Sequence, residues 1–463
     1  MEMNYVFLSA LILYLIVFLI IGIMDIKKIR SFTDYSVAGK SQSSFTVVMT
    51  LLATVVGAST TIGITDTVYK IGFPGIWWLA FGAIGLILQS VFLSERVRKI
   101  NADTLPDLAG RTVGKAAEFL IALIIVVSWV GVIAGQLVAM NSLITFALGK
   151  SDKVIFTIVS LIIIAYTTIG GQISVVRTDK LQLVIILLGV IACLVYLYGF
   201  IGGNTTDVIN NVELLNENYT PANLFTQFFV IGGVYFLGPD IMSRNFISKD
   251  EHTAKNSARI SGIVLLIFSL VITLVGMWIR FNVTPEELGE SGALMYAVSL
   301  LPKALGILLL FGLLSAILSS TDTCLINAST IFVKDILKKE SVSLVRITVL
   351  AIGGLSLLLA VLGRGDIMSL LTGAYSIYTP GVIFPLMIAI FAHGRGGIRI
   401  PVWMAAVISG GVCGLAGTYF SKILTSIGIP DIVMNYLTLI GMGASLILSI
   451  ASVRFGKTTK KEM

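Results

Sequence analysis

The stretch from Ser44 to Asp66, SFTVVMTLLATVVGASTTIGITD, is apolar enough to cross a membrane, yet glycines and consecutive hydroxyl residues interrupt its middle. A second stretch, Leu224 to Arg244, LFTQFFVIGGVYFLGPDIMSR, carries two glycines and then a Gly-Pro pair. Proline removes a helical hydrogen bond and clashes with the preceding turn, so the second stretch is predicted to unwind. Broken transmembrane helices expose backbone groups at membrane depth. Glycine that only permits close helix packing is the alternative for each stretch taken singly.

The composition defines the solvent in which the chain folds. Of 463 residues, 56% are hydrophobic and only 12% are charged, against a usual charged share of about 25%. This predicts an all-α polytopic membrane protein. The first apolar run, from Tyr5 to Met24, is long enough to span and has no basic segment before it, so we expect it to stay attached and not to be a signal peptide.

A hydropathy window of about 19 residues predicts about thirteen transmembrane segments. Their approximate ranges are 5–25, 44–66, 75–95, 116–149, 154–171, 179–201, 222–246, 258–281, 303–333, 344–362, 366–392, 400–424 and 430–454. Most of the 32 Lys and Arg residues fall in alternate connections, whereas the connection 202–221 is acidic. The positive-inside rule then predicts a multi-pass protein of the cell (plasma or inner) membrane, with its N-terminus outside and its C-terminus cytoplasmic.

The net charge of +7 is spread over all the inner connections, so nucleic-acid binding is not expected. The interrupted stretches are the second and the seventh predicted segments. The two segments are five apart, and because five is odd, two five-helix units that begin with them cross the membrane in opposite directions. This is the arrangement of an inverted repeat.

The ninth segment contains AILSSTDTC, residues 316–324. At helical spacing Ala316, Ser319, Ser320 and Thr323 share one face. Hydroxyls together with unpaired carbonyls, which a break at 53–56 would supply, are the ligands that a hard cation prefers. Hydroxyls that bond to their own helix or to a neighbouring helix are the alternative.

Three aspartates stand out. A charged Asp322 at mid-bilayer costs about 2.5–3.5 kcal/mol, so it needs a cation, a proton or Lys334 as a partner. Asp179 is either an N-terminal acid of the sixth segment, with Thr178 as cap, or an ion ligand on the exit path. Asp240 follows Pro239 and is either a cap or a gate residue, of which we favour the cap.

The remaining reactive side chains give little sign of catalysis. Cys193, Cys324 and Cys413 sit in apolar runs without metal-ligand spacing and are expected to pack. His252 and His393, the only histidines, are predicted in loops. No zinc-protease motif, paired core histidine or nucleophile–base set is present, so an enzyme is not expected.

Five ordered motifs over about residues 31–340 resemble the sodium:solute symporter family, which includes proline, pantothenate, sialic acid and sodium/galactose transporters. They are FTDYSVAGKS (32–41), LLATVVGASTTIG (51–63), TIGGQISVVRTDKLQ (168–182), GPDIMSRNFISKDEHTAKNSARI (238–260) and LSAILSSTDTCLINASTIFVKDI (314–336).

The resemblance implies a LeuT-type fold with an inverted five-helix repeat. The expected organisation is a peripheral first helix at 1–30, a first repeat at 31–201, an inverted second repeat at 202–395, and two peripheral helices with a cytoplasmic tail at 396–463.

The family's main sodium site would fall on a set of backbone carbonyls and hydroxyls: Ala53, Val56, Ala316, Ser319 and Ser320. A second cation site, found in some members, would match Asp179, Ser319, Asp322 and Thr323. Those members have hydroxyls where this chain has Asp322, a departure that would strengthen, alter or protonate the second site.

The family's solute site implies one set of candidate ligands: Thr60, Thr61, Gln136, Tyr235 and Phe236. Tyr69 and Trp78 are candidate gate residues. Ile231 and Val55 replace the tryptophan and the carboxylate of proline-type members, and the arginine of sialic-acid members has no counterpart in the fourth segment. Because no Lys or Arg is expected in the core, a small neutral or monocarboxylic solute fits better than a polyanion.

The function expected from these residues is sodium-coupled import of a small polar solute, an amino acid or a small carboxylate or vitamin-like nutrient, by alternating access. The alternatives are proton coupling through Asp322 in the same fold and, more remotely, an intramembrane enzyme or a channel. The expected partners are the solute, co-transported sodium and the lipid bilayer, with no organic cofactor. The sequence does not determine the oligomeric state, for which a monomer is one candidate.

Overall fold

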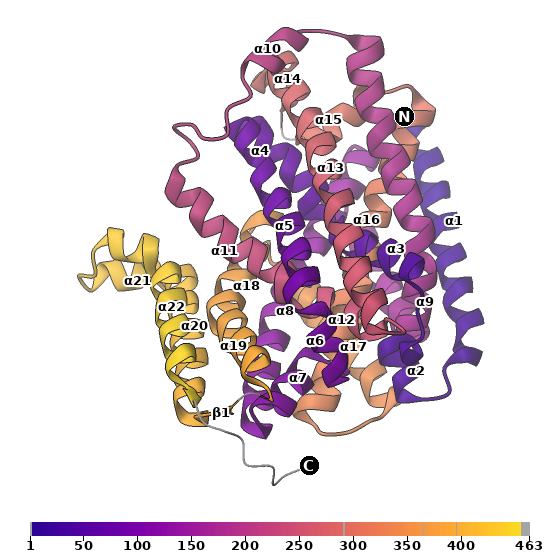
Figure 1. The fold of residues 1–463 in the computed structure, drawn as a ribbon. Coiled ribbons are helices and arrows are strands. Elements are labelled where there is room, and N and C mark those ends of the chain that lie inside the picture. Colours follow the sequence, from indigo (N-terminus) through magenta and orange to yellow (C-terminus); the bar gives the residue numbers. More distant parts are fainter. Residues whose placement is uncertain (1, 290–291, 364, 395, 455–463) are drawn as a thin grey trace.

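A computed structural model describes residues 2–289, 292–363, 365–394 and 396–454. The chain is almost wholly helical (Figure 1). Two short strands, β1 (Gly397–Ile398) and β2 (Val453–Arg454), pair antiparallel near the C-terminal end.

The helices follow one another along the chain with short connections. Up to the first long connection they are α1 (Glu2–Asp25), η1 (Ile26–Lys28), α2 (Phe32–Val37), η2 (Ala38–Lys40), α3 (Ser44–Val55), η3 (Ser59–Gly63), α4 (Ile64–Ile71), η4 (Phe73–Ile76), α5 (Trp77–Phe92), α6 (Ser94–Ile100), α7 (Leu105–Thr112), α8 (Lys115–Leu148), α9 (Lys153–Tyr196) and η5 (Leu197–Ile201).

The second half contains α10 (Thr205–Asn210), α11 (Pro221–Leu237), α12 (Pro239–Ile247), α13 (Glu251–Asn282), α14 (Pro285–Leu288), α15 (Ala293–Leu300), α16 (Lys303–Ile331), η6 (Phe332–Ile336), α17 (Val342–Val361), α18 (Ile367–Tyr378), η7 (Thr379–Ile383), α19 (Phe384–Ala392), α20 (Ile400–Tyr419), α21 (Ser421–Ser426) and α22 (Asp431–Ala451).

Both predicted interruptions are confirmed. α3 ends at Val55, Val56 leaves the helical region (φ −86°, ψ 77°), and the chain resumes as a helix bent by 62°. α11 ends at Leu237, and the extended Gly238 (ψ 149°) is followed by Pro239 at the start of α12. Proline is tolerated there because the first helical N–H has no partner within the helix.

Within the described residues, nine helices are long and apolar enough to span, or ten when the bent pair around Gly57 is taken as one span. The predicted count of about thirteen is therefore not reproduced by length and composition alone. Part of the difference lies in α9, whose 44 residues correspond to about 66 Å of helix, twice the hydrocarbon thickness.

α9 is broken at Gly171, whose backbone (φ 59°, ψ −168°) is not helical. The break falls where the fifth segment was predicted to end, but the helix resumes directly, so the sixth segment begins before the predicted residue 179. Thr178 and Asp179 consequently lie inside a helix, and Thr178 Oγ1 donates to the carbonyl of Ser174 (3.1 Å). The interpretation of Asp179 as a helix N-terminal acid with Thr178 as cap is also wrong.

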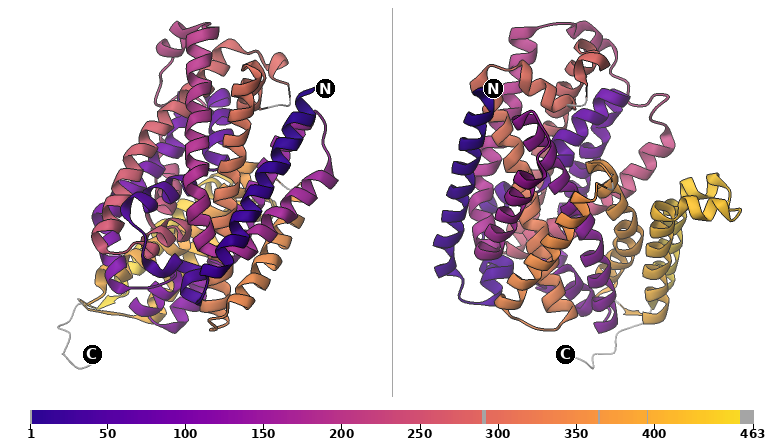
Figure 2. Two further views of the ribbon diagram at one scale, coloured as in Figure 1. Left: turned by 90° about the vertical axis from the view of Figure 1, so that its right-hand side faces the viewer. Right: turned by 180° about the vertical axis from the view of Figure 1, so that it is seen from behind.

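The terminal helices lie at opposite edges of the bundle. α1 runs along one edge, and α20 with α22 runs along the other, as both views from the side and from behind show (Figures 1 and 2). α1 begins at the end of the bundle where α10 lies, and β2 lies at the other end.

The predicted positions of the histidines and cysteines can also be compared with the structure. His252 lies in the first turn of α13 instead of a loop, whereas His393 directly follows α19, and both are exposed. Cys193 and Cys324 are buried and Cys413 is partly buried, in line with packing roles.

Candidate ion and solute site

The break after α3 faces α16. The Gly57 N–H donates to Thr60 Oγ1 (2.8 Å), so it does not close the helix onto the carbonyl of Ala53. Ser320 Oγ donates to the carbonyl of Thr54 (2.8 Å), and a Cβ on Gly57 would collide with the Ser320 side chain. The break and the hydroxyl face of α16 are therefore in direct contact.

All five residues of the predicted main sodium site are buried: Ala53, Val56, Ala316, Ser319 and Ser320. Ala53 lies in α3, Val56 at its C-cap and the other three in α16, and of these three Ser320 makes the contact with the break. Within the described residues no group of three or more His, Cys, Asp or Glu gathers as a metal site. An ion at this position would be held by hydroxyls and carbonyls, which suits sodium better than a transition metal.

A buried arginine contacts two of the four residues of the predicted second cation set, Asp179 and Thr323. Arg244 is 0% exposed, and its Nη2 donates to Asp179 Oδ2 (3.1 Å), to Thr54 Oγ1 (2.6 Å) and to Thr323 Oγ1 (2.6 Å). Asp179 also accepts from Ser319 Oγ (2.5 Å). A guanidinium thus already balances the charge of Asp179, one member of the predicted second cation set, in this structure.

The expectation of a core without Lys or Arg was wrong. The cause is α12, which continues after the break as a buried helix. Asp240 and Arg244 are one turn apart on it, so both side chains point to the same side. That spacing directly after a Gly-Pro break is the sequence signal that could have revealed the arginine.

Asp322 lies apart from this cluster. Its Oδ1 accepts from Thr167 Oγ1 of α9, and its Oδ2 has no hydrogen-bond partner within the described part of the chain. Lys334, one of its three expected partners, bonds instead to Asp103 and to Asp107 Oδ2 (3.3 Å). A proton or a bound cation therefore remains for Asp322.

The aspartate that holds Lys334 lies outside the spanning helices. Burial opposes ionisation of Asp103, but the ammonium groups of Lys334 and Lys40 outweigh it and hold the pKa of Asp103 below its ordinary value. Lys334 is thereby committed to an ion pair at the end of the bundle.

A small cavity of about 40 Å³ lies between the two helix breaks. Its lining includes three predicted residues, Gln136, Tyr235 and Ser320. Gln136 Oε1 also accepts from the N–H of Ala58 (3.2 Å), which ties α8 to the break. The volume is far below the roughly 300–1,000 Å³ of typical ligand pockets, so this cavity is closed to an organic solute.

Two residues around the predicted Asp240 were missed by the sequence interpretation, Trp129, which lines this cavity, and Asn327. Asp240 accepts from Trp129 Nε1 (2.7 Å), Asn327 Nδ2 (3.0 Å) and Cys324 Sγ (3.3 Å). Gly238 holds the N-cap position of α12, so the favoured role of Asp240 as a cap is wrong. Amide and indole groups within apolar segments were the available signal, because each needs a buried partner.

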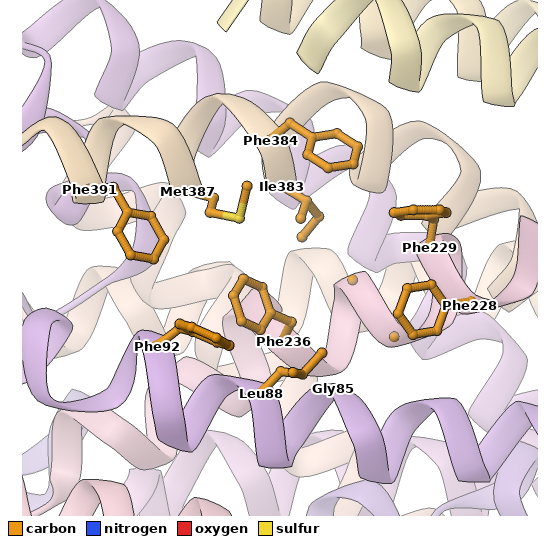
Figure 3. A pocket seen from close by; sticks show the side chains of 12 residues that line it. Gly85, Leu88, Phe92, Phe228, Phe229, Phe236, Ile383, Phe384, Met387 and Phe391 are labelled. Carbon is orange, nitrogen blue, oxygen red and sulfur yellow. The ribbon is translucent and has the colours of Figure 1, made fainter. Parts of the chain in front are cut away.

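The remaining predicted solute and gate residues do not line this cavity. Thr60 and Thr61 bond to backbone carbonyls of the break, at 2.8–3.1 Å. Phe236 lines a separate apolar cavity (Figure 3). Trp78 lines a third cavity, of about 580 Å³, and Tyr69 Oη donates to the carbonyl of Val283 (3.3 Å).

Two interrupted helices around an oxygen-rich buried site define the class of membrane proteins to which this one belongs, the secondary transporters with LeuT-like folds. The family model of the sodium:solute symporters ("Sodium:solute symporter family") matches residues 35–395. The chain belongs to this family, as the five motifs predict.

Curated relatives are similar at low identity. A sodium/pantothenate symporter of Haemophilus influenzae is 27% identical over 323 residues, 66% of this chain and 66% of that protein. The osmoregulated proline transporter OpuE of Bacillus subtilis is 23% identical and covers 96% of this chain and 95% of its own length. The family and these relatives are transporters, not enzymes.

Solved structures share the fold. A Na⁺-coupled sialic acid symporter in a substrate-bound outward-open state aligns with a TM-score of 0.77 at 16% identity, over 98% of this chain and 99% of the other. MhsT in complex with L-phenylalanine aligns with a TM-score of 0.57 at 13% identity, over 89% and 99%.

Proposed function

We propose that this protein is a sodium-coupled secondary active symporter that imports a small polar organic solute by alternating access. The observation that carries the proposal is the contact between the α3 break and α16, where Ser320 packs on Gly57 and the Ala53 carbonyl is released from helical bonding. Family membership and the names of the relatives support coupling to sodium.

The proposed topology has thirteen spans in the cell membrane. The ten spans counted above become eleven when α9 is taken as two helices around Gly171, and α1 and α22 bring the number to thirteen. The basic connections support an outer N-terminus and a cytoplasmic C-terminus. Residues 31–201 and 202–395 are proposed as the inverted repeats, with 1–30 and 396–463 peripheral.

The proposed solute is an amino acid or a small carboxylate. Relatives named for proline and pantothenate support this class. The buried Arg244 does not extend the proposed class of solutes to polyanions, because Asp179 already neutralises the guanidinium. Gln136 and Tyr235 are the proposed solute contacts that line the closed cavity, which must open before a solute enters.

Uptake into proteoliposomes tests the coupling. With proline, pantothenate and a panel of amino acids and monocarboxylates, an inward sodium gradient is expected to raise the initial uptake of at least one solute about tenfold or more over equal potassium. The physical reason is that sodium occupies the α3–α16 contact before the solute binds. Uptake that ignores the sodium gradient for every solute would contradict the proposal.

Proton coupling is the second candidate, and the isolation of Asp322 is the observation that favours it. A fully buried carboxylate with one hydrogen bond and one unpaired oxygen is costly when ionised, so a proton would stabilise it. Sodium at the α3–α16 contact and a proton at Asp322 are separate sites, so each coupling can be tested alone.

We predict that Asp322→Asn keeps sodium-driven uptake within about fivefold of the parent protein, because the amide replaces a neutral carboxyl of the same shape. The measurement is initial uptake under a sodium gradient and, separately, under a pH gradient without sodium. Glu213→Gln, an exposed change, controls for expression and insertion. Uptake driven by the pH gradient in the parent and abolished in Asp322→Asn would establish the proton-coupled alternative instead.

A further inference from the structure

A second cavity lies on the side of the bundle between α5, α11 and the η7–α19 segment (Figure 3). Its volume is about 390 Å³, roughly ten times that of the cavity between the breaks. The residues that line it are Gly85, Leu88, Phe92, Phe228, Phe229, Gly232, Gly233, Phe236, Ile383, Phe384, Met387 and Phe391.

Every side chain in this lining is apolar, and six of them are phenylalanine rings. No lining side chain can donate or accept a strong hydrogen bond, so a polar solute would lose its hydration without compensation. Phe92, at one end of the cavity, is 48% exposed, which opens the cavity to the outside of the bundle. Because α5 and α11 belong to spanning segments, the surroundings there are lipid chains.

A cationic group stands at the Phe92 end. The Arg96 guanidinium lies 4.4 Å from the centre of the Phe391 ring, and Phe391 and Phe92 both line this end (Figure 3). Within the described part of the chain Arg96 has neither a hydrogen bond nor an ion pair. Stacking on a ring leaves the N–H groups at the guanidinium edge free, and their fork matches a phosphate.

Its basic neighbours are engaged elsewhere. Arg98 Nε donates to the carbonyl of Ser248 (2.9 Å), and Lys99 pairs with Glu251 (3.4 Å). Arg96 is therefore the cation of α6 with free donors, and it is the one that contacts the cavity lining.

We propose that this cavity binds one acyl chain of an anionic phospholipid whose headgroup phosphate is held by Arg96. The apolar lining selects the chain, and the guanidinium at the open end selects the charge of the headgroup. The occupant packs between α11 and η7–α19, against Phe236, which lies just before the Gly238 break.

The test is lipid binding by the detergent-purified full-length protein, measured by native mass spectrometry. Phosphatidylglycerol and phosphatidylcholine with identical palmitoyl and oleoyl chains are titrated separately. We expect phosphatidylglycerol to bind about fivefold more tightly, and Arg96→Gln to remove that preference. Lys99→Gln, a neighbouring charge outside the cavity, is the matched control and is expected to keep the preference.

The binding of the acyl chain is tested by filling the cavity with a larger side chain. Leu88→Trp is expected to reduce the binding of both lipids at least fivefold, whereas Leu188→Trp, at an exposed position of α9, leaves it unchanged. Met387→Trp from the opposite wall serves as a second filling variant if Leu88→Trp does not fold, which thermal unfolding reports.

Several results would overturn the proposal. Equal binding of the two phospholipids, an unchanged preference in Arg96→Gln, or unchanged lipid binding in both filling variants each contradict it. Displacement by oleate at equal concentration would assign the cavity to a free fatty acid, and a dimer that Leu88→Trp disrupts would assign it to a second copy of the chain. Binding is measured without sodium or transport, so its outcome is independent of the symporter proposal.

Discussion

Replacing Arg244 by methionine is expected to destabilise the folded protein by about 3–5 kcal/mol. The guanidinium is completely buried and offsets the charge of Asp179, which is also 0% exposed. Without it, an ionised carboxylate is left in the interior with only hydroxyl donors, and Thr54 and Thr323 lose a charged donor that now lies at 2.6 Å from each. Arg244 links α12 to α9, α3 and α16, so the substitution removes three contacts between helices at once.

Thermal unfolding in detergent measures this effect, with Arg177→Met as the matched control. Arg177 pairs with Asp25 at the same 3.1 Å, but its side chain is 48% exposed, and Asp25 keeps Lys28 at 2.7 Å. The control should therefore cost at most about 1 kcal/mol. Equal midpoints for the two variants would contradict the interpretation of Arg244 as the main charge partner of a buried aspartate.

A double variant separates the lost charge from lost packing. Arg244→Met combined with Asp179→Leu removes both charges, and we expect it to recover part of the stability, because apolar replacement of a buried ion pair is often neutral. A double variant as unstable as the sum of its single changes would show that the two residues act independently.

Removing the Ser320 hydroxyl is expected to weaken the apparent affinity for sodium by about 10- to 100-fold. A polar interaction with a charged group contributes about 1.5–3 kcal/mol, and we take the loss of one oxygen ligand of sodium to cost the same amount of binding free energy. Ser320→Ala deletes the α16 hydroxyl that packs directly on the α3 break, at 2.8 Å from the Thr54 carbonyl. The measurement is the sodium concentration that half-saturates uptake.

Ser315→Ala is the control for this change. Ser315 is buried in the same helix but bonds to Tyr14 Oη (2.6 Å), away from the break, so its loss should leave the sodium dependence unchanged. Ser319→Ala should weaken sodium binding as well, together with the loss of a hydrogen bond to Asp179. If Ser319→Ala and Ser320→Ala both leave the sodium dependence unaltered, the proposed site is wrong.

The sequence predicted those features that depend on local rules. A Gly-Pro pair must interrupt a helix because proline lacks the N–H, and α11 does end at Leu237. Hydroxyls at helical spacing had to share a face, and Ser319 and Ser320 lie buried on α16. The family motifs, in order, placed the chain in its family.

The sequence did not predict which charges pair across the bundle. Arg244 follows a break and precedes a basic connection, and no Lys or Arg was expected in the core. Only the burial of α12 shows that Arg244 reaches Asp179. Gly171 likewise permits a backbone turn without a loop, because glycine readily adopts positive φ.

Composition and local helix chemistry, therefore, determined by themselves that this is a helical membrane protein with two broken spans. Tertiary structure decided the rest. It brings Arg244 to Asp179, sets Asp322 against Thr167, and separates Phe236 from Tyr235 into different cavities. The physical reason is that hydrogen bonding within a helix depends on neighbouring residues, whereas a buried charge depends on which distant helix faces it.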